Sequence, residues 1–348
     1  MTESKPQTRS GIILKIILPV LIGLGVVVWL FYKEFNVEAL AQISFTPYAW
    51  FCLFLALVAV FMRDFGMAWR FRILTDHDLR WSRAANVTML CEFTSAITPT
   101  SVGGSALSMI FLNREGINIG RATTLTMTTL FLDELFFVIS IPIVFLIVPY
   151  SDLFGFGSRE FLDGIKIVFG IVYAVIAAWT AILFFGIIAK PKAIRHLLIR
   201  LFSLKLLRRW LPAVTELADN MVTTARGLRS RNFTWWLKGF GSTAFSWIGR
   251  YLVVNALFLG FVPGASQLTV FARQFVVWAL LMFSPTPGGS GLSEWLFKEY
   301  YGDLISGAGV VFILAILWRL LSYYIYLVIG IFLIPSFLNN KKSIKNND

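Results

Sequence analysis

The feature that most constrains this chain is a series of uninterrupted apolar runs, each about as long as a bilayer is thick. A helix needs about 20 apolar residues to cross about 30 Å of hydrocarbon. With 57% hydrophobic and 14% charged residues, the chain has too few polar side chains to cover a soluble domain of 348 residues. Runs such as 136–148 lack the alternation of barrel strands. Because only helices and closed barrels span lipid, the sequence predicts an all-α polytopic membrane protein.

Six apolar segments are expected to be full transmembrane helices, and two more carry a Pro and a Gly-Gly pair in the middle. Pro removes a backbone donor and Gly permits unusual dihedral angles, so each of the two is expected to form a re-entrant hairpin of two half-helices. The expected spans are 11–32, 47–69, 122–148, 165–189, 233–257 and 304–335, and the expected hairpins are 84–112 and 266–299.

Basic residues indicate the orientation of the spans. If the N-terminus is cytoplasmic and both hairpins return to the side they enter, the inner loops hold most of the Lys and Arg, including Arg70 and ten residues within 190–231. The outer loops then hold Lys33, Arg159 and Lys298. We therefore expect both termini on the cytoplasmic side of the cell (inner) membrane. The net charge of +12 is a topology signal, and no nucleic-acid partner is expected.

One inner segment, 191–211, mixes Leu, Ile, Phe and Trp with Lys and Arg. This composition suits a helix that lies on the inner leaflet and is attracted to anionic membrane lipids. A basic connector that merely fixes topology explains it equally well.

The two interrupted segments carry matching motifs. Residues 98–108 read TPTSVGGSALS, and residues 284–293 read SPTPGGSGLS. Charged residues recur around them at the same spacing, with an Arg about 35 residues before each Pro and a charged residue 34 after it. Such a match indicates an internal duplication. The expected organisation is an inverted 3+3 repeat, with a first half 1–150, a second half 151–338 and a cytoplasmic tail 339–348.

Backbone freed by the breaks offers N–H groups and positive helix ends to an anionic group, which is the arrangement of a transporter's central site. Small residues that simply let helices pack closely are the alternative. The candidate pathway residues of the two motifs are Pro99, Gly103, Gly104 and Ser105, and Pro285, Gly288, Gly289 and Ser290.

Charged side chains inside the apolar spans are the second group of candidates, because each costs about 2.5–3.5 kcal/mol to insert. Asp133 and Glu134 lie near the middle of the third span and Arg319 near the middle of the sixth. The repeat alignment predicts that Asp133 pairs with Arg319.

Arg63 and Arg250 are expected nearer the two opposite membrane faces, where their planar forks suit phosphate groups. Snorkelling to the inner interface is an alternative for Arg63. Within the hairpins, Glu92, Arg273 and Glu294 are candidate lining residues, although internal ion pairs would also explain them.

Metal and catalytic chemistry have little support in the sequence. The two cysteines, Cys52 and Cys91, lie in different apolar runs, and His77 and His196 lie in different basic loops. We expect no metal site, no cofactor, no disulfide and no enzyme activity.

Taken together, 99–104 and 285–294, the latter ending in Glu294, resemble the transmembrane region of lysylphosphatidylglycerol synthases. The likeness extends over nearly the whole chain. It implies the flippase half of that family, which transfers an aminoacylated phospholipid between leaflets. Because only 339–348 follow the last span, we expect a stand-alone member without the soluble aminoacyltransferase domain, so the cargo could be another lipid or a lipid-linked sugar.

The function expected is a lipid translocase for a phospholipid or lipid-linked headgroup, facilitated or coupled to an ion or proton gradient through Asp133 or Glu134. A nucleotide-binding Gly-x-x-x-x-Gly-Lys motif is absent from the sequence. The alternative is a secondary transporter of a small soluble anion. An intramembrane lipid-phosphate enzyme and a purely structural subunit are further readings, and a homo-oligomer is possible.

Overall fold

The computed structural model describes residues 45–98, 103–154, 159–186, 190–204, 207–282, 284 and 286–339. These residues are almost entirely helical and contain no strand, which confirms the all-α class. The expected first span 11–32, the residues 340–348 of the expected tail, and both Pro99 and Pro285 lie outside the described residues.

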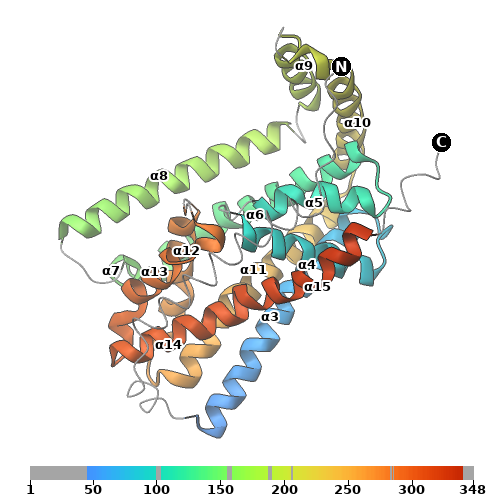
Figure 1. Ribbon diagram of the computed structural model, residues 1–348. Helices are drawn as coiled ribbons and strands as arrows, with labels where there is room; N and C mark the ends of the chain where they lie inside the picture. Colours follow the sequence, from blue (N-terminus) through green and yellow to red (C-terminus); the bar gives the residue numbers. More distant parts are fainter. Residues whose placement is uncertain are drawn as a thin grey trace.

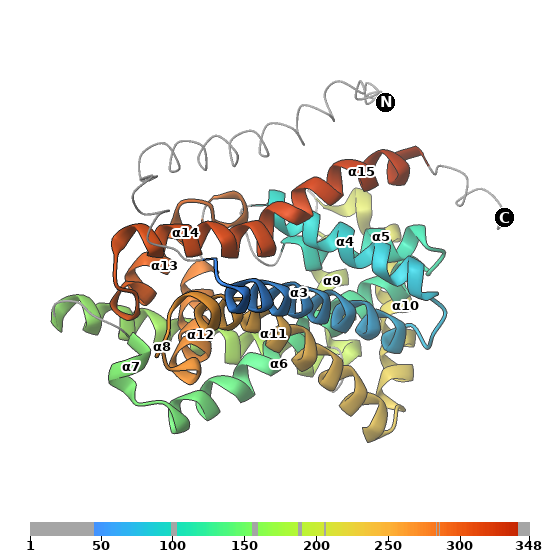
Figure 2. The ribbon, with the colours of Figure 1, turned by 90° about the horizontal axis from the view of Figure 1, so that it is seen from below.

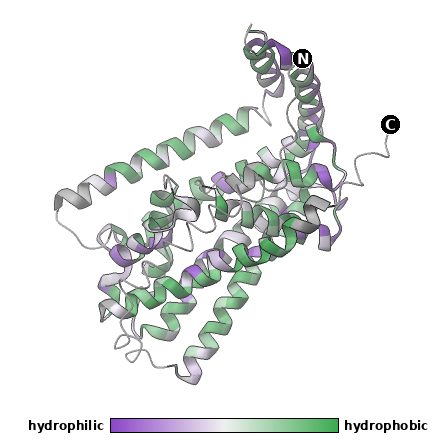
Figure 3. Cartoon of the chain, viewed as in Figure 1, coloured by the Kyte–Doolittle hydropathy of each residue, from purple (hydrophilic) through white to green (hydrophobic). Residues whose placement is uncertain are grey.

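Five helices of the described chain are long and apolar enough to cross a membrane, and they coincide with five of the six expected spans. In Figures 1 and 3 they form the elongated apolar body of the molecule. They are α3 (Pro47–Leu74), α6 (Ile119–Ile147), α8 (Arg159–Phe184), α11 (Phe233–Phe261), and a last helix composed of α14 (Ala308–Arg319), η5 (Leu320–Tyr324) and α15 (Ile325–Asn339).

The last helix is not regular. Its middle part, η5, is a π-helical turn that begins directly after Arg319. A π turn holds an extra residue and leaves backbone carbonyl groups free for other partners. The apolar pattern of the sequence predicts one unbroken span at 304–335 and gives no sign of this turn.

Each interrupted segment forms two helices with its break at the Pro/Gly motif, as expected. The first consists of α4 (Trp81–Ile97) and α5 (Gly103–Arg114). The second consists of α12 (Gln267–Leu281), the short turn η3 (Pro287–Gly289) and α13 (Leu292–Tyr301).

The two breaks touch each other. The backbone N–H of Gly288 donates a hydrogen bond of 3.2 Å to the carbonyl oxygen of Thr98. Gly288 and Gly289 have φ values of +57° and +72°, a region that favours glycine. Segments about 190 residues apart in the chain therefore meet at their two matching motifs.

Helices α3 and α11 lie side by side, with α3 at the lower edge of Figure 1 and in front in Figure 2. Their backbones approach at small residues: a Cβ on Gly66 would lie 2.8 Å from the nitrogen of Ser246, and a Cβ on Gly249 would lie 2.7 Å from the nitrogen of Arg63. Such contacts between glycines and facing backbones are a common way for membrane helices to pack. The crossing places Arg63 of α3 against Gly249 of α11, the residue directly before Arg250.

Residues outside the apolar body form a helical arm, which projects at the top of Figure 1. It consists of α9 (Pro191–Phe202), the turn η2 (Arg208–Trp210) and α10 (Leu211–Arg229), joined by an ion pair of 2.5 Å between Arg195 and Asp219. Leu197 and Leu201 are exposed on α9. The expected helix within 191–211 is therefore present, and its attraction to anionic lipid stays a prediction.

Two short elements complete the fold. Helix α7 (Tyr150–Phe154) follows α6, and the turn η4 (Gly302–Leu304) follows α13. Polar side chains begin several of the long helices. The side chain of Thr46 accepts the N–H of Ala49, and Asn232 accepts the N–H of Trp235.

Candidate functional site

A cavity of ≈ 200 Å³ lies at the centre of the apolar body. Its walls come from α3, α4, α6, α11, α12, the second Pro/Gly motif and the last helix, so both halves of the sequence contribute. It is lined by seven charged residues: Arg63, Arg70, Glu92, Asp133, Glu134, Arg250 and Arg319. All of them except Arg70 were predicted from the sequence as pathway residues. Gly288 and Gly289, also predicted, line the same cavity.

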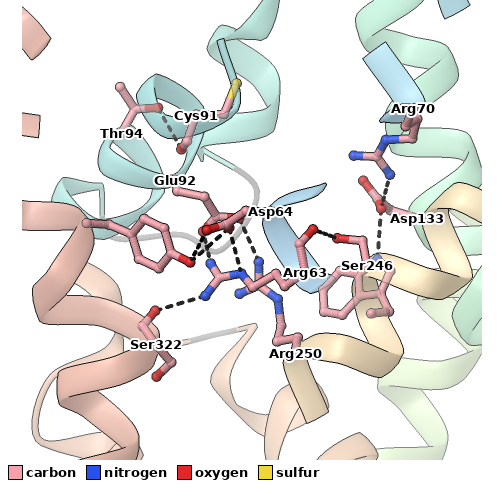
Figure 4. A network of polar contacts seen from close by, with 12 residues as sticks. Arg63, Asp64, Arg70, Cys91, Glu92, Thr94, Asp133, Ser246, Arg250 and Ser322 are labelled. Carbon is pink, nitrogen blue, oxygen red and sulfur yellow. Dashed lines mark hydrogen bonds and ion pairs between the residues drawn. The ribbon is translucent and has the colours of Figure 1, made fainter. Parts of the chain in front are cut away.

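Glu92 binds two arginines at once, as Figure 4 shows. Its Oε2 accepts from Arg63 Nη2, and its Oε1 accepts from Arg250 Nη2 at 2.9 Å. The expectation that Arg63 and Arg250 lie near opposite membrane faces is therefore wrong. The close crossing of α3 and α11 places them on one carboxylate inside the cavity.

The two arginines differ in exposure. The side chain of Arg63 is 2% exposed, and its Nη1 donates a hydrogen bond of 3.2 Å to the carbonyl oxygen of Ser322 in the π-helical turn. The side chain of Arg250 is 34% exposed and lies over the ring of Trp247, with 5.0 Å between guanidinium carbon and ring centroid. Arg250 is therefore the guanidinium that a bound group can reach.

Asp64 extends this cluster and was not among the residues predicted from the sequence. It accepts hydrogen bonds of 2.9 and 3.0 Å from the hydroxyl of Tyr326, and it lies 4.0 Å from Nε of Arg63. Tyr326 also places its ring under Arg63, at 4.5 Å. A carboxylate within an apolar span next to Arg63 is the signal that could have identified it.

The predicted pair of Asp133 with Arg319 is wrong. Asp133 accepts hydrogen bonds from Arg70 at 2.5 Å and from the indole N–H of Trp247 at 2.8 Å. Arg70 was assigned to an inner loop, but α3 continues through it and its side chain is 3% exposed. Arg70 lies two turns beyond Arg63 on α3, and this position brings it to the acid of α6.

Arg319 instead pairs with its own half of the chain. Its Nε donates to Glu294 at 2.9 Å, its Nη2 donates to the hydroxyl of Ser290 at 3.2 Å, and Tyr323 lies under the guanidinium at 3.9 Å. Glu294 also accepts the backbone N–H of Gly291 at 2.7 Å. Gly291 directly precedes α13, and its N–H was expected to face a ligand. Glu294 accepts this N–H instead.

The remaining motif residues have a packing role where their surroundings are described. Gly104 is buried, and a Cβ there would lie 2.1 Å from the carbonyl oxygen of Cys91, so this glycine lets α5 pack closely on α4. Gly104 therefore fits the alternative explanation, in which small residues let membrane helices pack closely. Gly103 begins α5 and Ser105 follows Gly104 in its first turn.

Arg273 is not a lining residue. Its guanidinium donates to both carboxylate oxygens of Asp303, at 2.6 and 2.9 Å, and to the carbonyl oxygens of Asp152 and Tyr300. For Arg273, the alternative of an internal ion pair is therefore correct. Arg273 ties together α7, α12 and the end of α13, away from the cavity.

Glu134 lines the cavity without a partner for one of its oxygens. The residue is 4% exposed, and its Oε2 has no hydrogen-bond partner. The buried hydroxyl of Tyr251, also in the cavity wall, has none either. Buried polar atoms without a partner are uncommon in native structures and call for a strained, functional or water-bound role.

No cluster of three or more His, Cys, Asp or Glu side chains able to hold a metal occurs in the described part of the chain. Cys52 and Cys91 are both buried and free. The charged groups that meet in the cavity are thus guanidinium and carboxyl groups.

Long apolar helices around a charged central cavity define a multi-pass α-helical membrane protein. The chain belongs to the lysylphosphatidylglycerol synthase transmembrane-region family, whose model matches residues 16–330. It is also similar to a UPF0104 membrane protein of Archaeoglobus fulgidus, with 21% identity over 300 residues that cover 84% of this chain and 89% of the relative.

Proposed function

We propose that the protein is a lipid translocase that moves a phospholipid or lipid-linked headgroup between the leaflets of the cell membrane. The observation that carries this proposal is the partly exposed guanidinium of Arg250 inside a cavity enclosed by apolar helices. The family, named for the membrane region of a lipid-modifying enzyme, supports a lipid-related role.

The headgroup would bind Arg250. An arginine side chain can donate two parallel hydrogen bonds to a phosphate. Arg63, which binds the same carboxylate as Arg250, adds positive potential to the cavity. Arg250 now uses Nη2 for Glu92, so a phosphate would share or replace that bond. A cavity of ≈ 200 Å³ is smaller than the roughly 300–1,000 Å³ of drug-sized ligand sites, which suits a headgroup whose acyl chains stay in the bilayer.

The proposed architecture is an inverted repeat with halves 1–150 and 151–338 and both termini in the cytoplasm. The two interrupted segments would enter from opposite sides as re-entrant hairpins and meet at the midplane. The matching motifs and the hydrogen bond between Gly288 and Thr98 support this arrangement. Movement of one half against the other would open the cavity to each leaflet in turn. The basic arm would lie on the anionic inner leaflet, and a homo-oligomer is compatible with this scheme.

The second candidate is a secondary transporter of a small soluble anion. The size of the cavity favours it, because ≈ 200 Å³ is also large enough for an inorganic anion. The two functions differ in whether lipid changes leaflet.

Reconstitution into liposomes with a fluorescent phosphatidylglycerol in both leaflets tests the proposal. External dithionite bleaches only the outer leaflet, so bleaching beyond that fraction reports exchange. We expect exchange by the wild type, its loss in Arg250→Ala, and its retention in Arg229→Ala, a matched loss of an exposed arginine on α10. Wild-type bleaching equal to that of empty liposomes, for several anionic headgroups, would refute the translocase. Uptake of labelled phosphate would then test the soluble-anion candidate.

A further inference from the structure

Glu134 differs from the other charged residues of the cavity because it lacks an opposite charge. Arg70 pairs with Asp133, Arg319 pairs with Glu294, and Arg63 and Arg250 share Glu92, with Asp64 4.0 Å from Arg63. Every arginine of the wall is therefore matched by a carboxylate. Glu134 is the carboxyl group left over.

An ionised Glu134 would be expensive at this position. It is buried, and its chain neighbour Asp133 already carries the negative charge that Arg70 and Trp247 bind. A second buried negative charge without a cation costs several kcal/mol, and a carboxyl group avoids that cost by holding a proton.

Charged groups on the elements packed against α6 do not supply the missing cation. On α11, Arg250 binds Glu92 and Lys238 is exposed, and on α12, Arg273 binds Asp303. On α3, Arg70 binds Asp133, and on α14, Arg319 binds Glu294.

The other neighbours of α6 place their charges near its two ends. Lys166 of α8 lies over Tyr150, beyond the last turn of α6 and roughly 20 Å along the axis from Glu134. Asn220 of α10 meets Gly120 in the first turn, so Glu216 and Asp219 of α10 and Arg114, at the end of α5, lie toward that end. The two arginines in the last turn of α10, Arg226 and Arg229, are exposed. In the wall of the same cavity, the buried hydroxyl of Tyr251 also has no hydrogen-bond partner.

We propose that Glu134 is the proton-binding site of the cavity and that a proton and an anionic headgroup bind to the cavity together. This inference rests on the translocase function proposed above. A phosphate near Arg250 adds negative charge to the cavity and so favours protonation of Glu134, and by linkage the proton favours binding of the phosphate.

On one side a hydronium ion transfers its proton to the carboxylate, so an O–H bond of hydronium breaks as the carboxyl O–H bond forms. On the other side the carboxyl O–H bond breaks and the proton returns to water. One proton carried with one singly charged headgroup moves no net charge. Transport then follows a pH difference across the membrane and not the membrane potential. At 1:1 coupling, the leaflet ratio of the lipid shifts by up to about tenfold per pH unit.

The first experiment is independent of the cargo. Infrared difference spectra of the purified protein between about pH 5 and about pH 9 report carboxyl groups that lose a proton in that range. We expect a protonated-carboxyl band in the wild type that is missing in Glu134→Gln and unchanged in Glu216→Gln, an exposed carboxyl on α10. Identical spectra for wild type and Glu134→Gln would overturn the inference, whatever the protein transports.

The second experiment uses the fluorescent phosphatidylglycerol liposomes with an imposed pH difference and the potential clamped by potassium and valinomycin. We expect the wild type and Glu216→Gln to shift the leaflet ratio, and Glu134→Gln to show no shift. Exchange by the wild type that ignores the pH difference, or a shift that persists in Glu134→Gln, would overturn the proton site and leave the translocase standing. Absence of any wild-type exchange would refute the translocase, and the infrared spectra would still decide the role of Glu134.

Discussion

Replacing Glu92 with glutamine is the most informative test of how the cavity is held together. Glutamine has nearly the same shape but no charge, and one of its two terminal atoms becomes a donor that faces a guanidinium. Glu92 now accepts hydrogen bonds from both Arg63 and Arg250. The substitution therefore leaves two arginines without their common carboxylate.

The expected loss of stability comes almost entirely from Arg63. Its side chain is 2% exposed, and removing one partner of a buried ion pair costs about 3–5 kcal/mol. Arg250 is 34% exposed and can turn toward the cavity, so its share resembles that of surface pairs, about 0.2–1 kcal/mol. Glu92→Gln should therefore destabilise the protein by about 3–5 kcal/mol.

The free energy of unfolding can be measured in mixed micelles with increasing dodecyl sulfate, followed by tryptophan fluorescence. The double variant Arg63→Met with Glu92→Gln should recover most of the loss, because it removes the orphaned charge as well. Asp219→Asn, which breaks the exposed pair with Arg195, should cost less than about 1 kcal/mol and serves as control. A loss below about 1 kcal/mol for Glu92→Gln, or simple additivity in the double variant, would refute the reasoning.

Two further substitutions test the second motif by the same unfolding titration. Gly288→Ala should destabilise the protein more than Gly264→Ala: both glycines have positive φ, but a Cβ on Gly288 would lie 1.9 Å from Cε2 of Tyr323, whereas nothing lies within 4 Å of one on Gly264. Equal losses of stability in the two variants would show that the ring of Tyr323 does not limit the space at Gly288. Arg319→Met should cost about 3–5 kcal/mol because it leaves Glu294 buried without its cation, and a stability like that of the wild type would contradict that role.

The sequence contains enough information to predict the helices and their interruptions. Apolar length decides which segments can span a membrane, and a Pro with a Gly-Gly pair interrupts a helix wherever it occurs. These are local properties of the chain, so the spans 47–69 and 233–257 and the two interrupted segments appear close to where they were expected.

Ion-pair partners, in contrast, cannot be predicted from local properties of the chain. They depend on where two helices cross and how each is rotated, which no spacing within one helix reveals. Gly66 and Gly249 allow α3 and α11 to touch, and this contact brings Arg63 and Arg250 to one carboxylate. The repeat alignment matched Asp133 with Arg319, but Arg70 reaches the acid first because α3 extends beyond the predicted end of its span.

The π-helical turn after Arg319 sets how the distal half of the last helix is rotated relative to α14. It adds one residue to a turn, and one residue corresponds to a rotation of about 100° on a helix. If the turn reverted to regular α-helix, everything beyond it would rotate by that angle against α14. Tyr326 would leave Asp64, and Ser322 would no longer offer its carbonyl oxygen to Arg63. Ser322 and Tyr326 thus fix the rotation of the last helix against α3, and Arg319 at its proximal end is fixed on Glu294.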